Sequence, residues 1–415
     1  MSAPLRFFYD IVCPYAAMAS LRVDGLAAAC GLSVHWSPVL LGGLLRAHGG
    51  PDDPNRTYAP ARAAMTRADI VRQAALHGRT FAVPAEHPRR TVAAMRLVVA
   101  ARSEQRQALS AALFEAYWQH GQDVADPAVL EAIARRFGMS AACVDDPAVK
   151  AELRARTDEA AAAGVFGVPT FVRGDVRIWG CDRMGLLARA LGGAPRDEAA
   201  AIAEGGEAAP ARVRFFFDVA SPYSYLAFTQ LERVCAAAAA TLVPVPVLLG
   251  ALFREIGTAD VPLFEMHAAK QAWVREDLAQ WAAAWGVPFR FPSVFPLRSL
   301  LAQRVIVVAP ATAPAIHRAA WVDDRRIDEA EGLAAVLAAA GFDARELLAQ
   351  AGGAAAKQAL RANTDAARDA GACGVPSYEI TRDGASPVLL WGQDRLATLA
   401  TILGGWSPPP TPHRV

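Results

Sequence analysis

Both halves of the chain open with two short apolar runs that flank a helical pattern. The first run, at residues 5–9 and again at 213–217, is rich in aromatic residues and has the length of a buried strand. Pro14 and Pro222 stand where a helix can begin, because proline lacks the N–H that a first helical turn leaves unpaired. The second runs, which predict further strands, lie at residues 32–36 and 241–247.

The remainder of each half predicts a helical insertion and then a pair of strands. About 100 residues of helical pattern lead to apolar runs at 168–172 and 176–179, which a tight turn separates. In the second half this turn falls at Asp383-Gly384, a strong hairpin dipeptide. A last helix is expected after Asp182 and Asp394, because Asp is a good N-cap. Each half therefore predicts β-α-β, a helical insertion and β-β-α, which is a thioredoxin-type core interrupted by an all-helical subdomain.

Three sequence blocks occur twice in the same order, at spacings of 208, 207 and 212 residues. A period of about 200 residues is a whole domain and not a solenoid unit, so the chain is a tandem duplication. The two copies differ where chemistry is expected, with Cys13 in one and Ser221 in the other. The paired blocks are Phe7–Tyr15 with Phe215–Tyr223, Gly164–Phe171 with Gly371–Tyr378, and Trp179–Arg183 with Trp391–Arg395.

The duplication sets the expected domain boundaries. The two domains span residues 4–193 and 212–405, and each is long enough to bury a sizeable core. Small residues, Pro and Gly mark 194–211 as an exposed linker. The proline-rich segment 406–415 has no helical pattern and is expected to be a disordered tail.

Composition narrows the classes of function. A net charge of +1 gives no electrostatic footprint for nucleic acid or an anionic membrane. No apolar stretch approaches about 18 residues, and the N-terminus lacks a secretory signal pattern, so we expect a cytoplasmic protein. The six cysteines form no Cys-x-x-Cys pair and no zinc-ligand spacing, so no metal is expected. Structural disulfides are not expected in a reducing compartment.

The residue before the first helix of each copy is the strongest candidate for chemistry. Cys13 and Ser221 each precede Pro and Tyr, at the positive end of a helix dipole with unpaired N–H groups. That environment favours a thiolate, whether of a protein cysteine or of a bound thiol cofactor. A serine cannot do redox work, but it can donate a hydrogen bond to a sulfur anion. A plain helix cap is the alternative interpretation of Ser221.

Two further pairs of residues are candidates for ligand binding. Val168-Pro169 and Val375-Pro376 suggest a special backbone such as a cis peptide, which would leave the valine N–H and C=O for an extended peptide-like ligand. A plain proline at a strand edge is the alternative. Cys181-Asp182 and Gln393-Asp394 offer helix-start amides for a small carboxylate and an Asp for an amino group. A simple N-cap is the alternative there.

These blocks together resemble a known family. Asp218-x-x-Ser221-Pro222-Tyr223, with Gly-Val-Pro and Trp-Gly-Gln-Asp-Arg, is similar to the 2-hydroxychromene-2-carboxylate isomerases. These enzymes belong with kappa-class glutathione transferases in the DsbA-like thioredoxin superfamily. The resemblance covers nearly the whole chain, twice. It implies an α/β fold of two DsbA-type thioredoxin domains, each with a helical insertion. Family members are generally single-domain subunits that dimerise, so we expect a pseudo-dimer within one chain, which can be monomeric.

The resemblance implies roles for the candidate residues. Ser221 would bind and activate the sulfur of glutathione, Val375 would pair its backbone with the glutathione peptide, and Gln393-Asp394 would hold the γ-glutamyl end. In the first copy these positions correspond to Cys13, Val168 and Cys181-Asp182. The family reaction interconverts a cyclic hemiketal carboxylate and its ring-opened benzylidenepyruvate by reversible addition of a thiol.

The chain departs from the family in the motif that follows the helical insertion. Where the family has Pro-x-Asn-Thr/Ser, Arg replaces Asn at Arg90 and Arg298. An arginine there can clamp a carboxylate through two hydrogen bonds, or it can be a surface residue. Arg62 and Lys270 lie where the family has a basic residue. The side chains predicted to bind substrate are Tyr15, Arg90, Tyr223, Lys270 and Arg298.

The leading interpretation is a glutathione-dependent isomerase that acts on an aromatic or conjugated carboxylate, with the second copy as the better site. One alternative is a thiol–disulfide oxidoreductase or glutathione transferase centred on Cys13, which requires a thiol pKa well below about 8.5. Ala16 stands where a DsbA-like protein has its second cysteine, which argues against dithiol oxidation. The other alternative is a duplicated binding scaffold without chemistry.

Overall fold

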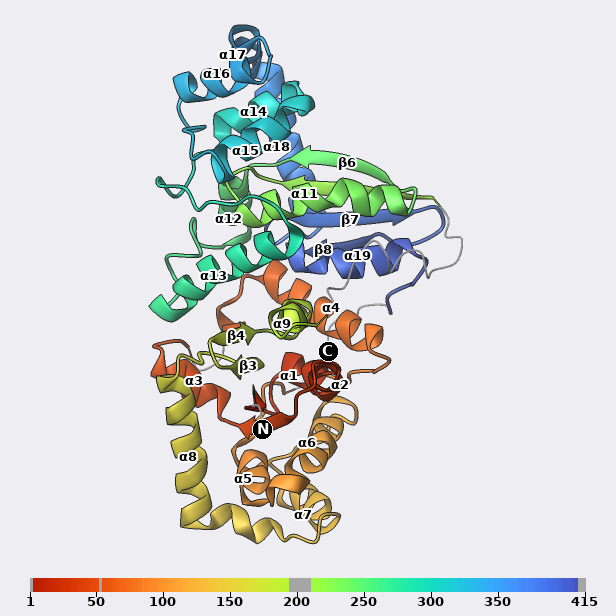
Figure 1. The fold of residues 1–415 in the computed structure, drawn as a ribbon. Helices are drawn as coiled ribbons and strands as arrows, with labels where there is room; N and C mark the ends of the chain where they lie inside the picture. The colour runs from red at the N-terminus through yellow and green to blue at the C-terminus, as the bar shows by residue number, and fades with distance from the viewer. Residues whose placement is uncertain (1–2, 52–53, 85, 194–209, 410–415) are drawn as a thin grey trace. The chain divides into compact units, whose positions relative to one another are not determined.

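A computed structural model of the chain describes residues 3–51, 54–84, 86–193 and 210–409 (Figure 1). The chain divides into two compact units, which we call the first and second domains. Of the described residues, those within Met1–Thr57 and Arg67–Arg196 belong to the first domain, and those within Tyr58–Thr66 and Asp197–Ser407 to the second. Of the predicted linker and tail, residues 194–209 and 410–415 lie outside the described residues.

Each domain contains a four-stranded mixed sheet with the same strand order. In the first domain the order is β2-β1-β3-β4, and in the second it is β6-β5-β7-β8. The first two strands along the chain are parallel, and the hairpin strands that follow are antiparallel. This topology confirms the predicted duplication of a thioredoxin-type core. The strands are β1 (Leu5–Tyr9), β2 (Val34–Pro38), β3 (Thr170–Arg173), β4 (Val176–Trp179), β5 (Ala211–Phe217), β6 (Thr241–Pro246), β7 (Ser377–Arg382) and β8 (Val388–Trp391).

The helices of the first domain include those on either side of its sheet and those of the insertion between β2 and β3. They are α1 (Pro14–Ser20), α2 (Val23–Ala29), α3 (Leu41–Ala47), α4 (Pro60–Leu76), α5 (Val92–Ala100), α6 (Ser103–Trp118), α7 (Pro127–Arg135), α8 (Pro147–Ala162) and α9 (Met184–Ala190). Residues 58–66, which include the first turns of α4, group with the second domain.

The second domain repeats this plan with a longer first helix. Its helices are α11 (Pro222–Ala237), α12 (Leu249–Ile256), α13 (Ala268–Trp285), α14 (Leu300–Val308), α15 (Ala313–Trp321), α16 (Ala330–Ala339), α17 (Ala344–Gly352), α18 (Ala354–Asp369) and α19 (Leu396–Leu403). The single helix α11, which runs alongside the sheet in Figure 1, corresponds to α1 and α2 together. In the first domain the helix is interrupted at Arg22, whose backbone (φ −125°, ψ −24°) leaves helical geometry.

The pleat of β5 explains how the second sheet is covered on both faces. Phe216 points into a core with Val245 and Val247, to which α12 contributes Leu252 and α18 contributes Ala367. Its neighbours Phe215 and Phe217 point to the opposite face, where both rings pack against Phe228 of α11. The aromatic residues of β5 therefore pack against helices on both faces of the sheet. After β5 the chain continues into α11.

One predicted boundary and two predicted helix caps were wrong. Ala211, assigned to the linker, is the first residue of β5, because it pairs with Arg382 of β7 and is buried. Asp182 and Asp394 do not cap the last helices. Each lies inside a three-residue 3-10 helix, and the α-helix starts after it.

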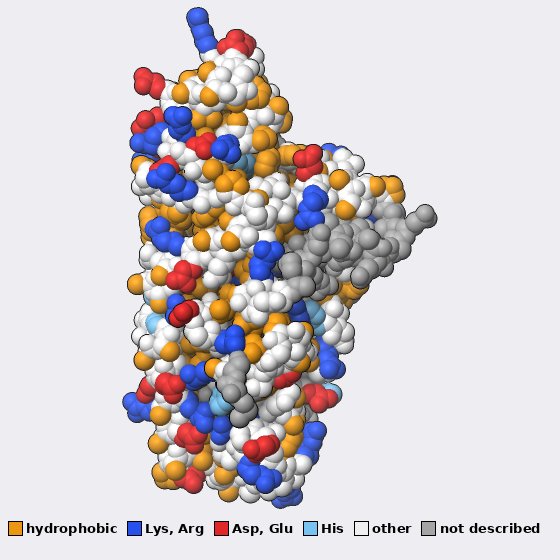
Figure 2. Space-filling model, in the orientation of Figure 1, with side chains coloured by type: hydrophobic (Ala, Val, Ile, Leu, Met, Phe, Trp, Pro, Cys, Tyr) orange, Lys and Arg blue, Asp and Glu red, His pale blue; other side chains and the backbone are white. Residues whose placement is uncertain are grey.

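Within the described residues, no helix combines the length and the apolar character that crossing a bilayer requires. On the face that Figure 2 shows, acidic and basic side chains are interspersed.

Candidate active site

Ser221 lies between the end of β5 and the first turn of α11, at the N-cap position. Its backbone is extended (φ −95°, ψ 119°), and its Oγ accepts a hydrogen bond from the Ser224 N–H at 3.2 Å. The hydroxyl donates to the carbonyl oxygen of Val375 at 3.4 Å, and the Val375-Pro376 peptide is cis. The side chain is 5% exposed. The structure thus brings together the hydroxyl, the start of a 16-residue helix and the proline loop, as the sequence predicted.

Cys13 takes the corresponding place in the first domain, with different chemistry. Its Sγ donates to the carbonyl oxygen of Val168 at 3.2 Å, next to the cis Val168-Pro169 peptide, and it makes no side-chain cap. Burial raises the pKa of the Cys13 thiol to about 12, although the N–H groups of Ala16 and Tyr15 act in the opposite direction. The low thiol pKa that the oxidoreductase alternative requires is not found here.

The proline loop lies beside the glycine that precedes the last turn. The Gly392 N–H donates to the carbonyl oxygen of Pro376 at 2.9 Å. Gly392 has φ +105°, and a Cβ there would collide with the carboxylate of Asp394, so only glycine suits this position. The Val375 N–H forms no hydrogen bond with another described residue. The cis-proline loop and the Gln393-Asp394 turn are therefore joined by a hydrogen bond, and together they form one edge of the site around Ser221.

Gln393 is the second distinctive group of this edge. Its side chain is 3% exposed, and its Nε2 has no hydrogen-bond partner among the described residues. Asp394 is next to it and forms an ion pair with Arg395 at 3.2 Å. In the first domain, Cys181 replaces Gln393, and Asp182 pairs with Arg183 at 2.8 Å. An orphaned buried amide is costly, so Gln393 is suited to a ligand that accepts its hydrogen bond.

A buried aspartate in each domain holds the loops of the site, and the sequence analysis assigned it no role. Asp218 accepts hydrogen bonds from the Ala220 N–H at 2.9 Å and the Leu249 N–H at 2.8 Å, and a third from the Ser299 side chain. Its carboxyl is 1% exposed, and burial raises its pKa. The carboxylate therefore ties together the loop before Ser221 and the starts of α12 and α14.

The first domain repeats this arrangement with Asp10. This carboxyl accepts hydrogen bonds from the Leu41 N–H at 2.8 Å and from the Thr91 hydroxyl at 2.7 Å, and burial again raises its pKa. The sequence contains one signal for the role of these aspartates, which is their repetition: both copies place Asp three residues before the Cys or Ser.

The residues predicted to bind substrate differ in burial, since the two arginines are exposed and the other three residues are partly buried. Arg90 and Arg298 are exposed, and it is the next residue of each motif, Thr91 or Ser299, that is buried. Lys270 is partly buried on the first turn of α13, and burial lowers the pKa of its amine to about 8. Tyr15 and Tyr223, also partly buried, lie on the first turns of α1 and α11.

Other kinds of site have less support. Among the residues that the structure describes, no group of three or more His, Cys, Asp or Glu side chains could hold a metal ion. None of the six cysteines, all of which are described, forms a disulfide.

Comparison with known proteins gives the same fold family twice. The model of the DSBA-like thioredoxin domain matches residues 4–192 and again residues 212–404. Glutathione S-transferase kappa 2 of Caenorhabditis elegans is 31% identical over 207 residues, which are 46% of this chain and 91% of that protein. The 2-hydroxychromene-2-carboxylate isomerase of Sphingobium xenophagum is 27% identical over 194 residues, which are 45% of this chain and 97% of that protein.

A solved structure of 2-hydroxychromene-2-carboxylate isomerase matches with a TM-score of 0.42 and 24% identity, over 46% of this chain and 95% of that one. The transferase and isomerase sequences each match about half of this chain, as a tandem duplication requires. The chain belongs to the DSBA-like thioredoxin family, as a tandem member of its 2-hydroxychromene-2-carboxylate isomerase and kappa-class glutathione transferase branch.

Proposed function

We propose that the second domain binds glutathione and uses it to isomerise an aromatic or conjugated carboxylate. The observation that carries this proposal is the edge around Ser221. A hydroxyl at a helix start, the Val375 N–H and the orphaned Gln393 amide lie on connected loops. The names of relatives in the same branch, an isomerase and a glutathione transferase, support it.

The residues of this edge fit the three parts of the tripeptide. Ser221 would donate its hydroxyl hydrogen to the sulfur, in place of the present bond to Val375, and so stabilise the thiolate. Val375 would pair its N–H with the peptide, and Gln393 and Asp394 would hold the γ-glutamyl carboxylate and amine. In this arrangement, bound glutathione would supply a thiol that adds reversibly to a double bond of a conjugated system. Rotation about that bond is blocked before the addition and easy after it. Lys270 is the candidate to hold the substrate carboxylate.

A glutathione transferase is the second candidate, because a kappa-class relative is 31% identical. The two activities differ in the fate of the thiol, which leaves in an isomerisation and stays bound to the product in a transfer. Mass spectrometry of the products separates them, because only a transferase accumulates a thioether.

We further propose that the chain works in the cytoplasm, where reduced glutathione is available. The pairing of two domains within one chain would take the place of a dimer of single-domain subunits. A mass of 43.9 kDa in solution, that of a single chain, would support this arrangement.

The test is titration calorimetry of reduced glutathione into the wild type, Ser221→Ala and Cys13→Ala. Losing a hydrogen bond to a charged sulfur is expected to weaken thiolate binding and turnover roughly ten- to hundredfold in Ser221→Ala. Cys13→Ala is the matched control and should bind like the wild type. Turnover of a chromene carboxylate, followed by its ultraviolet spectrum, should show the same order.

The outcomes decide between the candidates. If the wild type does not bind glutathione, the proposal is wrong, and a scaffold without chemistry becomes the better interpretation. If only Cys13→Ala weakens binding, the working site is in the first domain.

A further inference from the structure

A pocket of the second domain has no place in the reaction proposed above. It lies between α12, α14 and α18 and has a volume of about 220 Å³. Its apolar lining includes Leu248, Leu300 and Leu360, and its basic lining includes Arg304 and Lys357. Neither Ser221 nor Gln393 lines it. We call it the Arg304 pocket.

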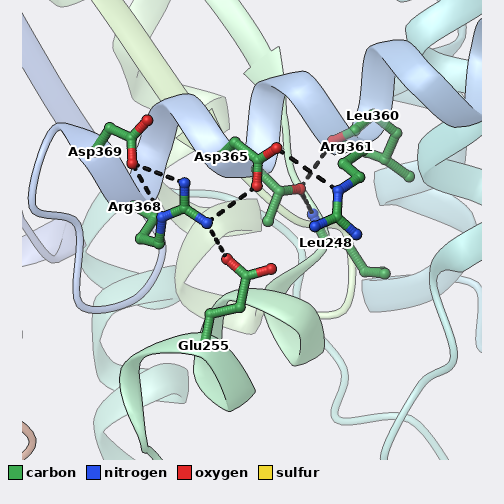
Figure 3. Close-up of polar contacts among 8 residues, drawn as sticks. Leu248, Glu255, Leu360, Arg361, Asp365, Arg368 and Asp369 are labelled. Carbon is green, nitrogen blue, oxygen red and sulfur yellow. Dashed lines mark hydrogen bonds and ion pairs between the residues drawn. The ribbon is translucent and has the colours of Figure 1, made fainter.

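The acidic residues of this pocket already have partners. Glu255 pairs with Arg368 at 2.7 Å, and Asp365 pairs with Arg368 at 3.2 Å and with Arg361 at 3.7 Å (Figure 3). In contrast, the side chains of Arg304 and Lys357 form no hydrogen bond or ion pair with another described residue. The Nε of Arg304 is buried without a partner. Two positive charges are therefore available at the pocket for an anion.

In the first domain a carboxylate lies near the two corresponding cations. Arg96 and Lys150 occupy the positions of Arg304 and Lys357, on the corresponding helices α5 and α8. Lys150 pairs with Asp145 at 3.0 Å. The Lys150 hydrogen bond and charge, together with the charge of Arg96, hold the pKa of the Asp145 carboxyl below its usual value. In the first domain one carboxylate thus pairs with Lys150 and also interacts with the charge of Arg96.

The second domain lacks this carboxylate and its neighbour. Asp145 and Asp146 correspond to Gly352, the last residue of α17, and to Gly353, the N-cap residue of α18. Asp146 caps α8 by accepting the Ala148 N–H at 2.8 Å, whereas Gly353 gives α18 no side-chain cap. The basic pair is retained while both acids are absent, so an external anion can take their place beside Arg304 and Lys357.

We propose that the Arg304 pocket binds a small organic carboxylate, whose charge lies against Arg304 and Lys357 and whose apolar body lies against the three leucines. Leu300 is 41% exposed at the pocket, and an apolar ligand would cover it. An inorganic phosphate would leave the apolar lining unused. The pocket volume of about 220 Å³ is below the ~300–1,000 Å³ typical of pockets for drug-sized ligands, so the ligand should be small. The proposal does not depend on the glutathione chemistry of the Ser221 site.

The test is ligand-observed NMR and titration calorimetry with 2-naphthoate, on the full chain with and without reduced glutathione. The decisive variant is Gly352→Asp, which restores the counter-ion of the first domain. No atom lies within 4 Å of a Cβ built at Gly352, so the fold should accept the substitution. We expect Gly352→Asp to weaken 2-naphthoate binding by about two- to fivefold, the effect of one ion pair near a surface. The double variant Arg304→Gln/Lys357→Gln should weaken it further.

Matched controls separate this pocket from other sites. Arg96→Gln/Lys150→Gln removes the corresponding cations of the first domain and should leave binding unchanged. The neutral analogue 2-naphthylmethanol should bind more weakly than the carboxylate. The proposal is overturned if the wild type does not bind, if Gly352→Asp binds 2-naphthoate as well as the wild type does, or if inorganic phosphate binds as tightly. Loss of glutathione binding in Ser221→Ala would have no bearing on it.

Discussion

His317 is a buried histidine with no polar partner. Its ring is 1% exposed and lies among Phe217, Tyr225 and Phe228. Neither ring nitrogen has a hydrogen-bond partner among the described residues, and burial lowers its pKa to about 3. The first domain has Phe114 in the corresponding position, against Tyr9. A phenylalanine therefore fits this core, and the histidine makes it sensitive to acid.

The sign of the pH dependence follows from this shift. Between about pH 3 and pH 6.5, His317 takes up a proton only in the unfolded chain, so stability falls as the pH falls through this range. We expect His317→Phe to be more stable than the wild type at pH 5 by roughly 2 kcal/mol, and by less at pH 7. Urea unfolding at both pH values measures the difference. The exposed His120→Gln is the control, and an equal gain in both variants would contradict this account.

Lys270 gives the proposed reaction its own pH dependence. Burial lowers the pKa of its amine to about 8, so the side chain is charged at pH 7 and loses its charge as the pH rises through 8. If it holds the substrate carboxylate, KM should rise with pH through this range. Lys270→Arg should shift the rise to higher pH, because a guanidinium stays charged. A KM profile that is identical in Lys270→Arg and the wild type would exclude this role.

At the scale of the elements, the two buried aspartates are clamps between a strand, a helix start and the helical insertion. An asparagine keeps the shape of the side chain, but its amide nitrogen faces donors where a carboxylate oxygen accepted. We expect Asp218→Asn and Asp10→Asn each to reduce the free energy of unfolding of their domain by about 1–3 kcal/mol.

The two substitutions differ in what else they change. Only Asp218→Asn should weaken glutathione binding, because it loosens the loop before Ser221. Denaturant unfolding and calorimetry on both variants make the comparison. Equal losses of affinity would show that the clamp has no specific link to the second site.

The elements themselves were largely predictable, because their signals are local. Aromatic and apolar runs predict the strands in the order in which they occur along the chain. The Gly-Val-Pro blocks predict the cis prolines that the structure shows at Pro169 and Pro376. The clamps were not predictable in this way. The contact of Asp218 with Ser299 joins segments about 80 residues apart, and no local pattern specifies it. The unpaired Gln393 amide is likewise visible only once the loops around it are placed.

At the scale of the whole molecule, the two domains share one topology and differ in their sites. The second domain has a serine hydroxyl and an unpaired Gln393 amide, where the first has a buried thiol and Cys181. We therefore expect one glutathione per chain, bound in the second domain. Calorimetric stoichiometry measures this directly, and two equivalent sites would show that the differences between the copies do not matter for binding.

The serine at the proposed site of the second domain also bears on oxidative damage. Peroxide converts exposed thiolates to sulfenic and then to sulfinic acids, whereas a serine hydroxyl does not undergo these oxidations. The one cysteine at an equivalent position, Cys13, is 6% exposed and held as the neutral thiol, which reacts poorly with peroxide. At a site centred on Ser221 the protein group itself would therefore resist this oxidation, and only the replaceable thiol of bound glutathione would be exposed to it.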